Sequence, residues 1–108
     1  MASEQRPPNP HVGDFIREEF MEPTGLTAYR LAKGLGITQT HLSQILKGQV
    51  RVTAEMALRL EAFFGCSADM WLGMQNSHDL TEARRKVGEE LAKIRRWEGA
   101  EEQADAAA

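Results

Sequence analysis

Residues 28–47 read AYRLAKGLGITQTHLSQILK, and they carry the most specific structural pattern in the chain. Two short helices that meet at a tight turn need a small residue inside the first helix and a glycine at the turn. Ala32 and Gly36 stand at these positions, and apolar residues bracket the turn at Leu31, Leu35, Ile37, Leu42 and Ile45. The spacing predicts a helix-turn-helix over residues 28–47. A purely structural helical repeat would show the apolar spacing without the Ala–Gly pair.

The second helix of this motif is expected to have one apolar and one polar face. Leu42, Ile45 and Leu46 are expected to point inward. The residues expected on the opposite, polar side include no Asp or Glu; they are Gln39, Thr40, Ser43, Gln44 and Lys47. Glutamine pairs bidentately with adenine in the DNA major groove, and Ser and Thr hydroxyls reach bases or phosphates. An ordinary solvated helix more often carries Glu–Lys pairs on this face. The polar face is therefore typical of a helix that reads DNA bases.

The charge distribution supports contact with nucleic acid although the net charge of the chain is −3. No Asp or Glu occurs over residues 23–54, where the cations are Arg30, Lys33, Lys47 and Arg51. The acids are concentrated in residues 14–22 and 98–105 instead. Phosphate contact depends on the face that carries the cations more than on the net charge.

Helix-start and helix-stop residues extend the helical pattern on both sides of the motif. N-cap residues precede the expected helices at Thr27, Thr38, Thr53 and Ser67. The helices are expected over residues 13–21, 28–35, 38–47, 53–64 and from 67 onward, and Asp14 favours the start of the first one electrostatically. Pro23 and Gly25 are expected to end that first helix. No segment alternates with period two, so the predicted fold class is all-α.

A second amphipathic segment follows, with apolar residues at Leu80, Ala83, Val87, Leu91, Ile94 and Trp97. Spacings of three and four residues predict a helix here. The pattern leaves open whether this helix continues the fifth one or follows a break near residues 76–77. The expected organisation is a disordered arm (1–10), a DNA-binding domain (11–80), an amphipathic helical extension (81–98) and a disordered tail (99–108).

Composition excludes several classes of protein. No uninterrupted apolar run exceeds three residues, so neither a membrane span nor a signal peptide is expected. Cys66 is the single cysteine and is interpreted as a half-buried filler rather than a reactive thiol. Ser43 and His41 do not face each other on a helix, and His11, His41 and His78 lack metal-ligand spacing. We therefore expect a cytoplasmic protein that is not an enzyme and binds no metal or other cofactor.

Residues 26–32 and 36–48 together resemble the Cro/C1-type helix-turn-helix family, and more closely the HigA-type antitoxins, also called virulence-associated protein I. The segment VGDFIREEF over residues 12–20 looks like that family's His-Pro-Gly-Glu opening, with Val12 in place of Pro and Asp14 in place of Glu. Residues 67–72 and 75–80 resemble its fifth-helix signature. The resemblance covers residues 9–80.

The resemblance implies a five-helix, lambda repressor-like domain with a C-terminal helical extension. It also implies a homodimer that binds double-stranded operator DNA, represses its own promoter, and neutralises a ribonuclease toxin as the antitoxin of a type II toxin–antitoxin module. The residues placed at base-reading positions are Gln39, Thr40, Ser43 and Gln44. Those expected at the DNA backbone are Thr27, Arg30, Lys33, Thr38, His41, Lys47 and Arg51.

Other functions remain as alternatives at this point. A stand-alone Cro/C1-type transcriptional regulator without a toxin partner has the same sequence features, and the neighbouring gene would separate the two. A protein-only adaptor would leave the acid-free polar face unexplained. Trp71 is expected in the core rather than at an exposed binding site. The apolar side chains of residues 80–97 are expected to cover the chain's own core, a second copy or the toxin.

Overall fold

The computed structural model describes residues 9–99, and every regular element within this range is a helix. The elements are α1 (Val12–Ile16), a π-helical turn η2 (Arg17–Met21), α2 (Glu22–Thr24), α3 (Ala28–Leu35), α4 (Gln39–Leu46), α5 (Ala54–Phe64) and α6 (Ala68–Ala92). Because α1, η2 and α2 follow one another without a break, this part of the chain forms five helices, as expected. Most of the expected disordered arm and tail lies outside the described residues.

Local capping signals position α3, α4, α5 and the start of α6. The side-chain oxygen of each expected N-cap accepts a hydrogen bond from the backbone N–H three residues later, at 3.0–3.2 Å, which confirms the four caps Thr27, Thr38, Thr53 and Ser67. Such a bond satisfies one of the N–H groups that a helix start leaves unpaired. Gly36 has a φ of 73°, a left-handed conformation that makes the tight turn between α3 and α4.

The first helix runs further than the sequence predicts. The expected end at Met21 and the expected role of Pro23 are wrong, because helical structure continues through α2 to Thr24. The other expected terminator is confirmed: Gly25 is the C-cap, with a φ of 75°. A proline ring clashes with the carbonyl group four residues earlier in a regular α-helix. The wider π-helical turn η2 precedes Pro23 and gives the ring room in this helix.

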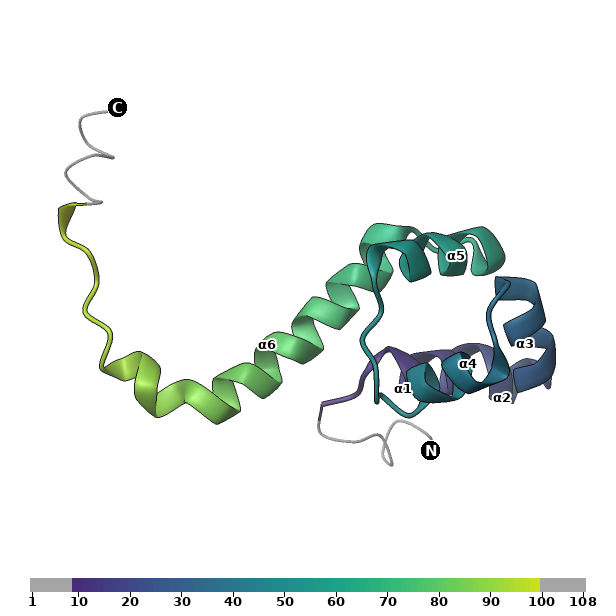
Figure 1. Cartoon of the computed structure of the whole chain (residues 1–108), viewed down its shortest axis with the longest axis horizontal. Coiled ribbons are helices and arrows are strands. Elements are labelled where there is room, and N and C mark those ends of the chain that lie inside the picture. The colour runs from purple at the N-terminus through teal and green to yellow at the C-terminus, as the bar shows by residue number, and fades with distance from the viewer. Residues whose placement is uncertain (1–8, 100–108) are drawn as a thin grey trace.

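The C-terminal helix α6 is one element of 25 residues, so no break occurs near residues 76–77. It ends at Ala92, whereas the apolar spacing predicts helix as far as Trp97. Figure 1 shows the second half of α6 projecting away from the other helices. Residues 93–98 are exposed, and a helix without tertiary packing depends on intrinsic propensity alone.

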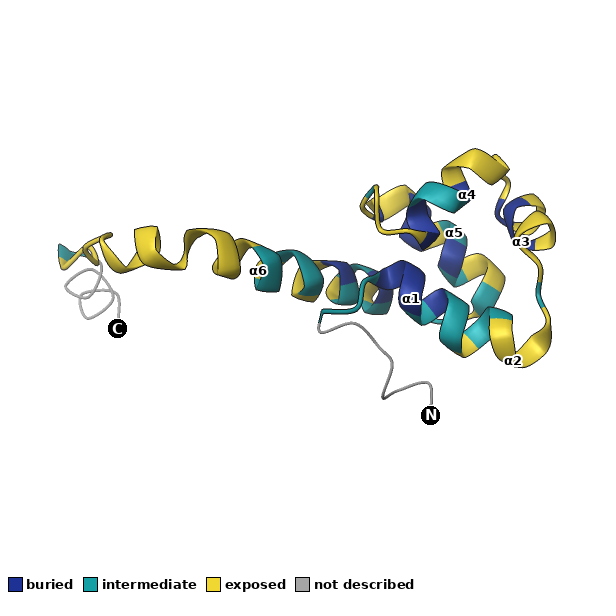
Figure 2. Ribbon diagram, turned by 90° about the horizontal axis from the view of Figure 1, so that it is seen from below, coloured by how far each residue is buried: buried dark blue, intermediate teal, exposed yellow. Residues whose placement is uncertain are grey.

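The hydrophobic core lies where α1, α3, α4, α5 and the first half of α6 face one another (Figure 2). Its buried apolar members are Val12, Ile16, Leu31, Ala32, Leu35, Leu42, Ile45, Leu46, Val52, Met56, Ala57, Leu60 and Trp71. All three residues expected to point inward from α4 are among them. Trp71 is 0% exposed, which confirms its predicted place in the core. None of the helices in residues 9–99 combines the length and apolar character needed to cross a bilayer.

The end of the expected arm is held against α6. The Asn9 side-chain amide donates to the His78 carbonyl oxygen at 3.0 Å and to Glu82 Oε2 at 2.8 Å. The Asn9 carbonyl oxygen in turn lies 3.1 Å from His78 Nδ1. The expected disorder is therefore wrong for Asn9, because its polar groups find partners on a helix about seventy residues away, which the local composition does not show.

Candidate nucleic-acid interface

Helix α4 is held by its apolar residues and leaves its polar residues at the surface. Leu42, Ile45 and Leu46 are buried against the other helices. Gln39 and Thr40 are exposed at the start of α4, and Ser43 and Gln44 are half-buried one turn further on. The structure therefore brings the four predicted base-reading residues together on one accessible face of a single helix.

The residues predicted to contact the DNA backbone surround this face, and all of them are exposed: Thr27, Arg30, Lys33, Thr38, His41, Lys47 and Arg51. Thr27 and Thr38 use a hydroxyl lone pair for their caps, so each O–H remains able to donate to a phosphate oxygen. The Lys33 ammonium lies 5.9 Å from the centre of the exposed Tyr29 ring. Arg30, Lys33 and Lys47 form no ion pair within residues 9–99.

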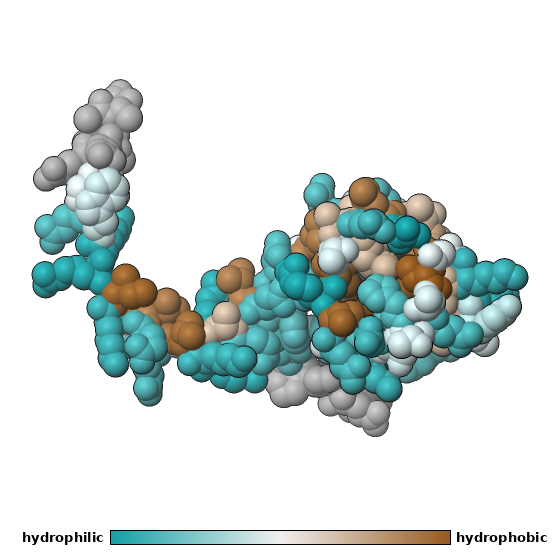
Figure 3. Space-filling view, in the orientation of Figure 1, coloured by the Kyte–Doolittle hydropathy of each residue, from teal (hydrophilic) through white to brown (hydrophobic). Residues whose placement is uncertain are grey.

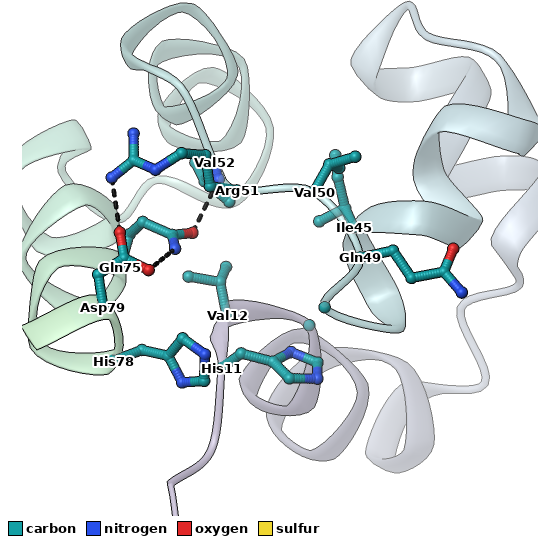
Figure 4. Close-up of a pocket in the computed structure, with 12 residues that line it drawn as sticks. His11, Val12, Ile45, Gln49, Val50, Arg51, Val52, Gln75, His78 and Asp79 are labelled. Atoms are coloured by element: carbon teal, nitrogen blue, oxygen red, sulfur yellow. Dashed lines mark hydrogen bonds and ion pairs between the residues drawn. The ribbon is translucent and has the colours of Figure 1, made fainter. Parts of the chain in front are cut away.

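Arg51 differs from the other cations because it is already paired. Its Nη2 atom lies 2.7 Å from Asp79 Oδ2 on α6, and this hydrogen bond is the main reason that the pKa of Asp79 is below its usual value. The Gln75 side chain donates to Asp79 Oδ1 at 2.9 Å and accepts from the Val52 N–H at 2.7 Å (Figure 4). This network ties the loop after α4 to α6.

These residues line a pocket of about 100 Å³ between the start of α1, the loop after α4, and α6. The rings of His11 and His78 lie edge to face in it, with centres 5.9 Å apart. Burial is the largest cause of a lowered His11 pKa, which the Asp14 carboxylate opposes. No group of three potential metal ligands occurs in the described residues. This network is not among the features predicted from the sequence, where its one visible sign is the i, i+4 spacing of Gln75 and Asp79.

A second missed feature holds the C-terminal end of α4 in place. Asp14 and His11 form a reciprocal capping box at the start of α1, and Asp14 is 3% exposed. Arg17 pairs with the Asp14 carboxylate and donates to the carbonyl oxygen of Leu46, the last residue of α4. A Cβ atom on Gly13 would overlap the carbonyl oxygens of Ile45 and Leu46. Close backbone contact between α1 and α4 thus requires glycine at position 13.

Gly13→Ala is expected to push α1 and the end of α4 apart. Overpacking at a tight contact costs about 1–3 kcal/mol of folding free energy, and the displaced helix should also bind DNA more weakly. Urea unfolding measures the first effect and DNA titration the second. Gly73→Ala is the matched control, because nothing lies within 4 Å of its added Cβ. That control should be neutral or slightly stabilising, and equal effects of the two changes would contradict the role of Gly13.

Comparisons with known proteins agree with this geometry. A family model described as helix-turn-helix matches residues 18–71, half of the 108-residue chain. Virulence-associated protein I of Dichelobacter nodosus is 39% identical over 78% of this chain and 78% of its own length. Antitoxin HigA-1 of Vibrio cholerae is 35% identical over 73% of this chain and 74% of its own. A solved structure of antitoxin GraA in complex with its operator has a TM-score of 0.77 at 32% identity, covering 85% of this chain and 94% of that one.

The fold, the exposed polar face of α4 and the matching family model define a helix-turn-helix protein of the Cro/C1 type. Within that class, the chain belongs to the family of HigA-type antitoxins and virulence-associated protein I. The matches extend well beyond the helix-turn-helix itself, since they cover about three quarters of each relative.

Proposed function

We propose that the chain is the antitoxin of a type II toxin–antitoxin module, which binds operator DNA in its own promoter as a homodimer and neutralises a ribonuclease toxin in the cytoplasm. The observation that carries the proposal is the acid-free, accessible polar face of α4 in a chain related to HigA-1 and to operator-bound GraA. A single recognition helix reaches too few base pairs for useful specificity, so proteins of this type pair on two half-sites.

In this proposal the polar face of α4 enters the major groove. Gln39, Thr40, Ser43 and Gln44 contact base edges, because their amides and hydroxyls both donate and accept hydrogen bonds. Arg30, Lys33 and Lys47 and the capping hydroxyls of Thr27 and Thr38 contact phosphates, which position the helix without reading sequence. Whether Arg51 joins them depends on its ion pair with Asp79. Residues 11–80 form the DNA-binding unit, and α6 beyond it forms the extension.

Gln44→Ala tests whether α4 reads sequence. Loss of one bidentate base contact costs about 1–3 kcal/mol, so affinity for a duplex carrying the chain's own promoter should fall roughly tenfold to a hundredfold. Affinity for a random duplex of equal length should change little. Gln49→Ala is the matched control: Gln49 is exposed but lies beyond the end of α4, and its loss should leave the ratio of the two affinities unchanged. An equal loss on both duplexes for Gln44→Ala would show that Gln44 does not read bases.

Co-expression with the neighbouring gene tests the antitoxin role. If that gene encodes the ribonuclease toxin, its product alone should arrest growth, and co-production of this chain should restore growth. The two proteins should also copurify. Promoter binding without growth rescue or copurification would favour the alternative, a stand-alone transcriptional regulator.

A further inference from the structure

The imidazole ring of His11 connects the start of α1 with the residue that follows α4. Its Nδ1 atom accepts a hydrogen bond from the Asp14 backbone N–H at 3.3 Å, which caps α1. The same ring packs against Gly48, where an added Cβ would lie 2.5 Å from His11 Cδ2. Gly48 directly follows Lys47, the C-cap of α4, and Figure 4 shows the ring beside the loop that begins there. One side chain therefore contacts both the first helix and the end of the helix that is proposed to read DNA.

The hydrogen bonds of the His11 ring fix its protonation state. A ring nitrogen that accepts a hydrogen bond carries no proton, so Nδ1 is unprotonated and Nε2 carries the hydrogen of the neutral ring. Nε2 lies 3.5 Å from Asp14 Oδ2, so this N–H faces a carboxylate. Protonation of the ring adds a hydrogen to Nδ1, which would then face the Asp14 N–H as donor against donor. The charged ring therefore cannot cap α1 in its present position.

The charges around the His11 ring act in opposite directions. They belong, element by element, to Asp14 on α1, Arg17 on η2, His78 on α6, and the mutually paired Arg51 and Asp79. Burial is the main reason that the pKa of His11 lies below its ordinary value. The Asp14 carboxylate raises this pKa, whereas Arg17 and His78 lower it. The surroundings therefore favour the neutral ring, which is the form that caps α1.

We infer that His11 is a positioning residue for α4, and that protonation of its ring releases this helix, so that sequence reading weakens in acid. The inference rests on the proposed function, because it concerns the regulation of the same DNA-reading face. The neutral ring keeps Asp14 in the capping box, and Asp14 pairs with Arg17, which donates to the Leu46 carbonyl oxygen. The charged ring loses the cap, attracts the Asp14 carboxylate and repels the Arg17 guanidinium. Both changes draw the support away from the last turn of α4.

The direction of the pH effect follows from the lowered pKa of His11. Above about pH 6.5, the ordinary pKa of histidine, the ring is neutral and the support is intact. As the pH falls through the lower pKa of His11 in the folded chain, the ring takes up a proton that the DNA-reading arrangement excludes. Affinity for a promoter duplex should then fall about tenfold for each further pH unit, because binding has to expel one proton from each copy's ring.

The quantity to measure is the ratio of affinities for a promoter duplex and a random duplex of equal length. Protonation of the exposed His41 adds a cation near the phosphates and strengthens binding to every duplex. This contribution cancels in the ratio, whereas misplacement of α4 affects the promoter duplex alone. In the wild-type chain the ratio should be constant above about pH 6.5 and should fall toward about pH 5.

Three variants separate the titration of His11 from its packing. His11→Asn keeps a side-chain oxygen that accepts at an N-cap but cannot titrate, so its ratio should stay near the wild-type value of about pH 8 down to about pH 5. His11→Ala has no acceptor, so its ratio should be low at every pH. His78→Asn is the matched control: it removes the other imidazole of the pocket, keeps a donor toward the Asn9 carbonyl oxygen, and should show the wild-type pH dependence. An acid loss in His11→Asn as large as in the wild-type chain would overturn the inference.

Sedimentation velocity tests whether the pH effect acts through assembly instead. Leu80, Val87 and Leu91 are 51%, 39% and 48% exposed, so the expectation that this segment covers the chain's own core is wrong. Figure 3 shows brown apolar surface along this projecting part of the chain, and Asp79 is the last residue that lines the pocket. The sedimenting mass should therefore be the same at about pH 8 and about pH 5. A mass that falls together with the affinity ratio would overturn the role of His11.

Nuclear magnetic resonance of the chain without DNA tests the switch independently of operator binding. The His11 Cε1–H, the Asp14 amide and the Gly48 amide should titrate with one shared midpoint below about pH 6.5. A Gly48 amide that does not follow His11 would show that protonation leaves the end of α4 in place and would overturn the inference. A wild-type chain that shows this shared titration but does not prefer its promoter duplex at about pH 8 would instead contradict the proposed function.

Discussion

Trp71→Ala is expected to unfold most of the chain at growth temperature. Trp71 is fully buried, and the rings of Phe15, Phe20 and Phe64 lie with their centres 5.6–6.1 Å from its own. Its indole N–H donates to the Cys66 carbonyl oxygen at 3.1 Å. Removing a buried tryptophan side chain costs about 3–5 kcal/mol, which approaches the whole stability of a small domain. Thermal unfolding followed by circular dichroism should show a midpoint lowered by at least about 12 °C.

Trp97→Ala is the matched control, because Trp97 is 62% exposed and lies beyond the end of α6. Its loss should change the free energy of unfolding by less than about 0.5 kcal/mol. Trp71→Phe keeps an aromatic ring but loses the indole N–H, and should fall between the wild-type chain and Trp71→Ala. A Trp71→Ala variant that melts like the wild-type chain would contradict the assignment of this residue to the core.

Operator affinity is expected to fall steeply as salt concentration rises. If Arg30, Lys33 and Lys47 each neutralise one phosphate, a dimer neutralises six, and the log–log slope of affinity against salt should be about −5. A fourfold rise in salt then weakens binding roughly 10³-fold. Arg51 does not contribute to this slope, because it forms an ion pair with Asp79. Titrations of a promoter duplex between about 50 and 200 mM salt measure the slope.

Asp79→Asn is expected to make the slope steeper, to about −7, because it releases one more cation in each copy for phosphate contact. Arg51→Ala should leave the slope at its wild-type value, because in the wild-type chain the ion pair with Asp79 already keeps Arg51 from contacting a phosphate. A wild-type slope near −7 that falls to about −5 in Arg51→Ala would show that Arg51 leaves Asp79 on binding DNA. The measurement therefore tests the sequence-based prediction that Arg51 contacts the DNA backbone.

The exposure of the predicted base-reading residues on one side of α4 was predictable because helical periodicity places them there. Leu42, Ile45 and Leu46 recur at helical spacing and are buried, which directs Gln39 and Gln44 away from the core. Gly13 and Arg17 were not predictable as supports of α4, because they act on carbonyl groups about thirty residues further along the chain. The local pattern of residues 12–20 does not show that Gly13 and Arg17 contact the C-terminal end of α4.

Features that arise within three or four residues follow from the local sequence. Thr38 caps the helix that follows it, and Gly36 and Gly48 adopt left-handed conformations where the chain turns. Each of these depends on a neighbouring backbone group and on the side chain present at that position. Helix boundaries near such residues agree with the structure for the same reason.

Features that depend on distant partners follow instead from the packing of the helices. No Asp or Glu occurs over residues 23–54, so the sequence predicts an unpaired cation at Arg51. Packing of α6 brings Asp79, 28 residues away, to Arg51, so that Arg51 Nη2 lies 2.7 Å from Asp79 Oδ2. Packing likewise decided that α6 continues without a break past residues 76–77. It also left the apolar side chains of Leu80, Val87 and Leu91 exposed beyond the core. The apolar spacing of a helix shows that one face avoids water, but it does not identify what covers that face, because burial depends on every other element packed nearby.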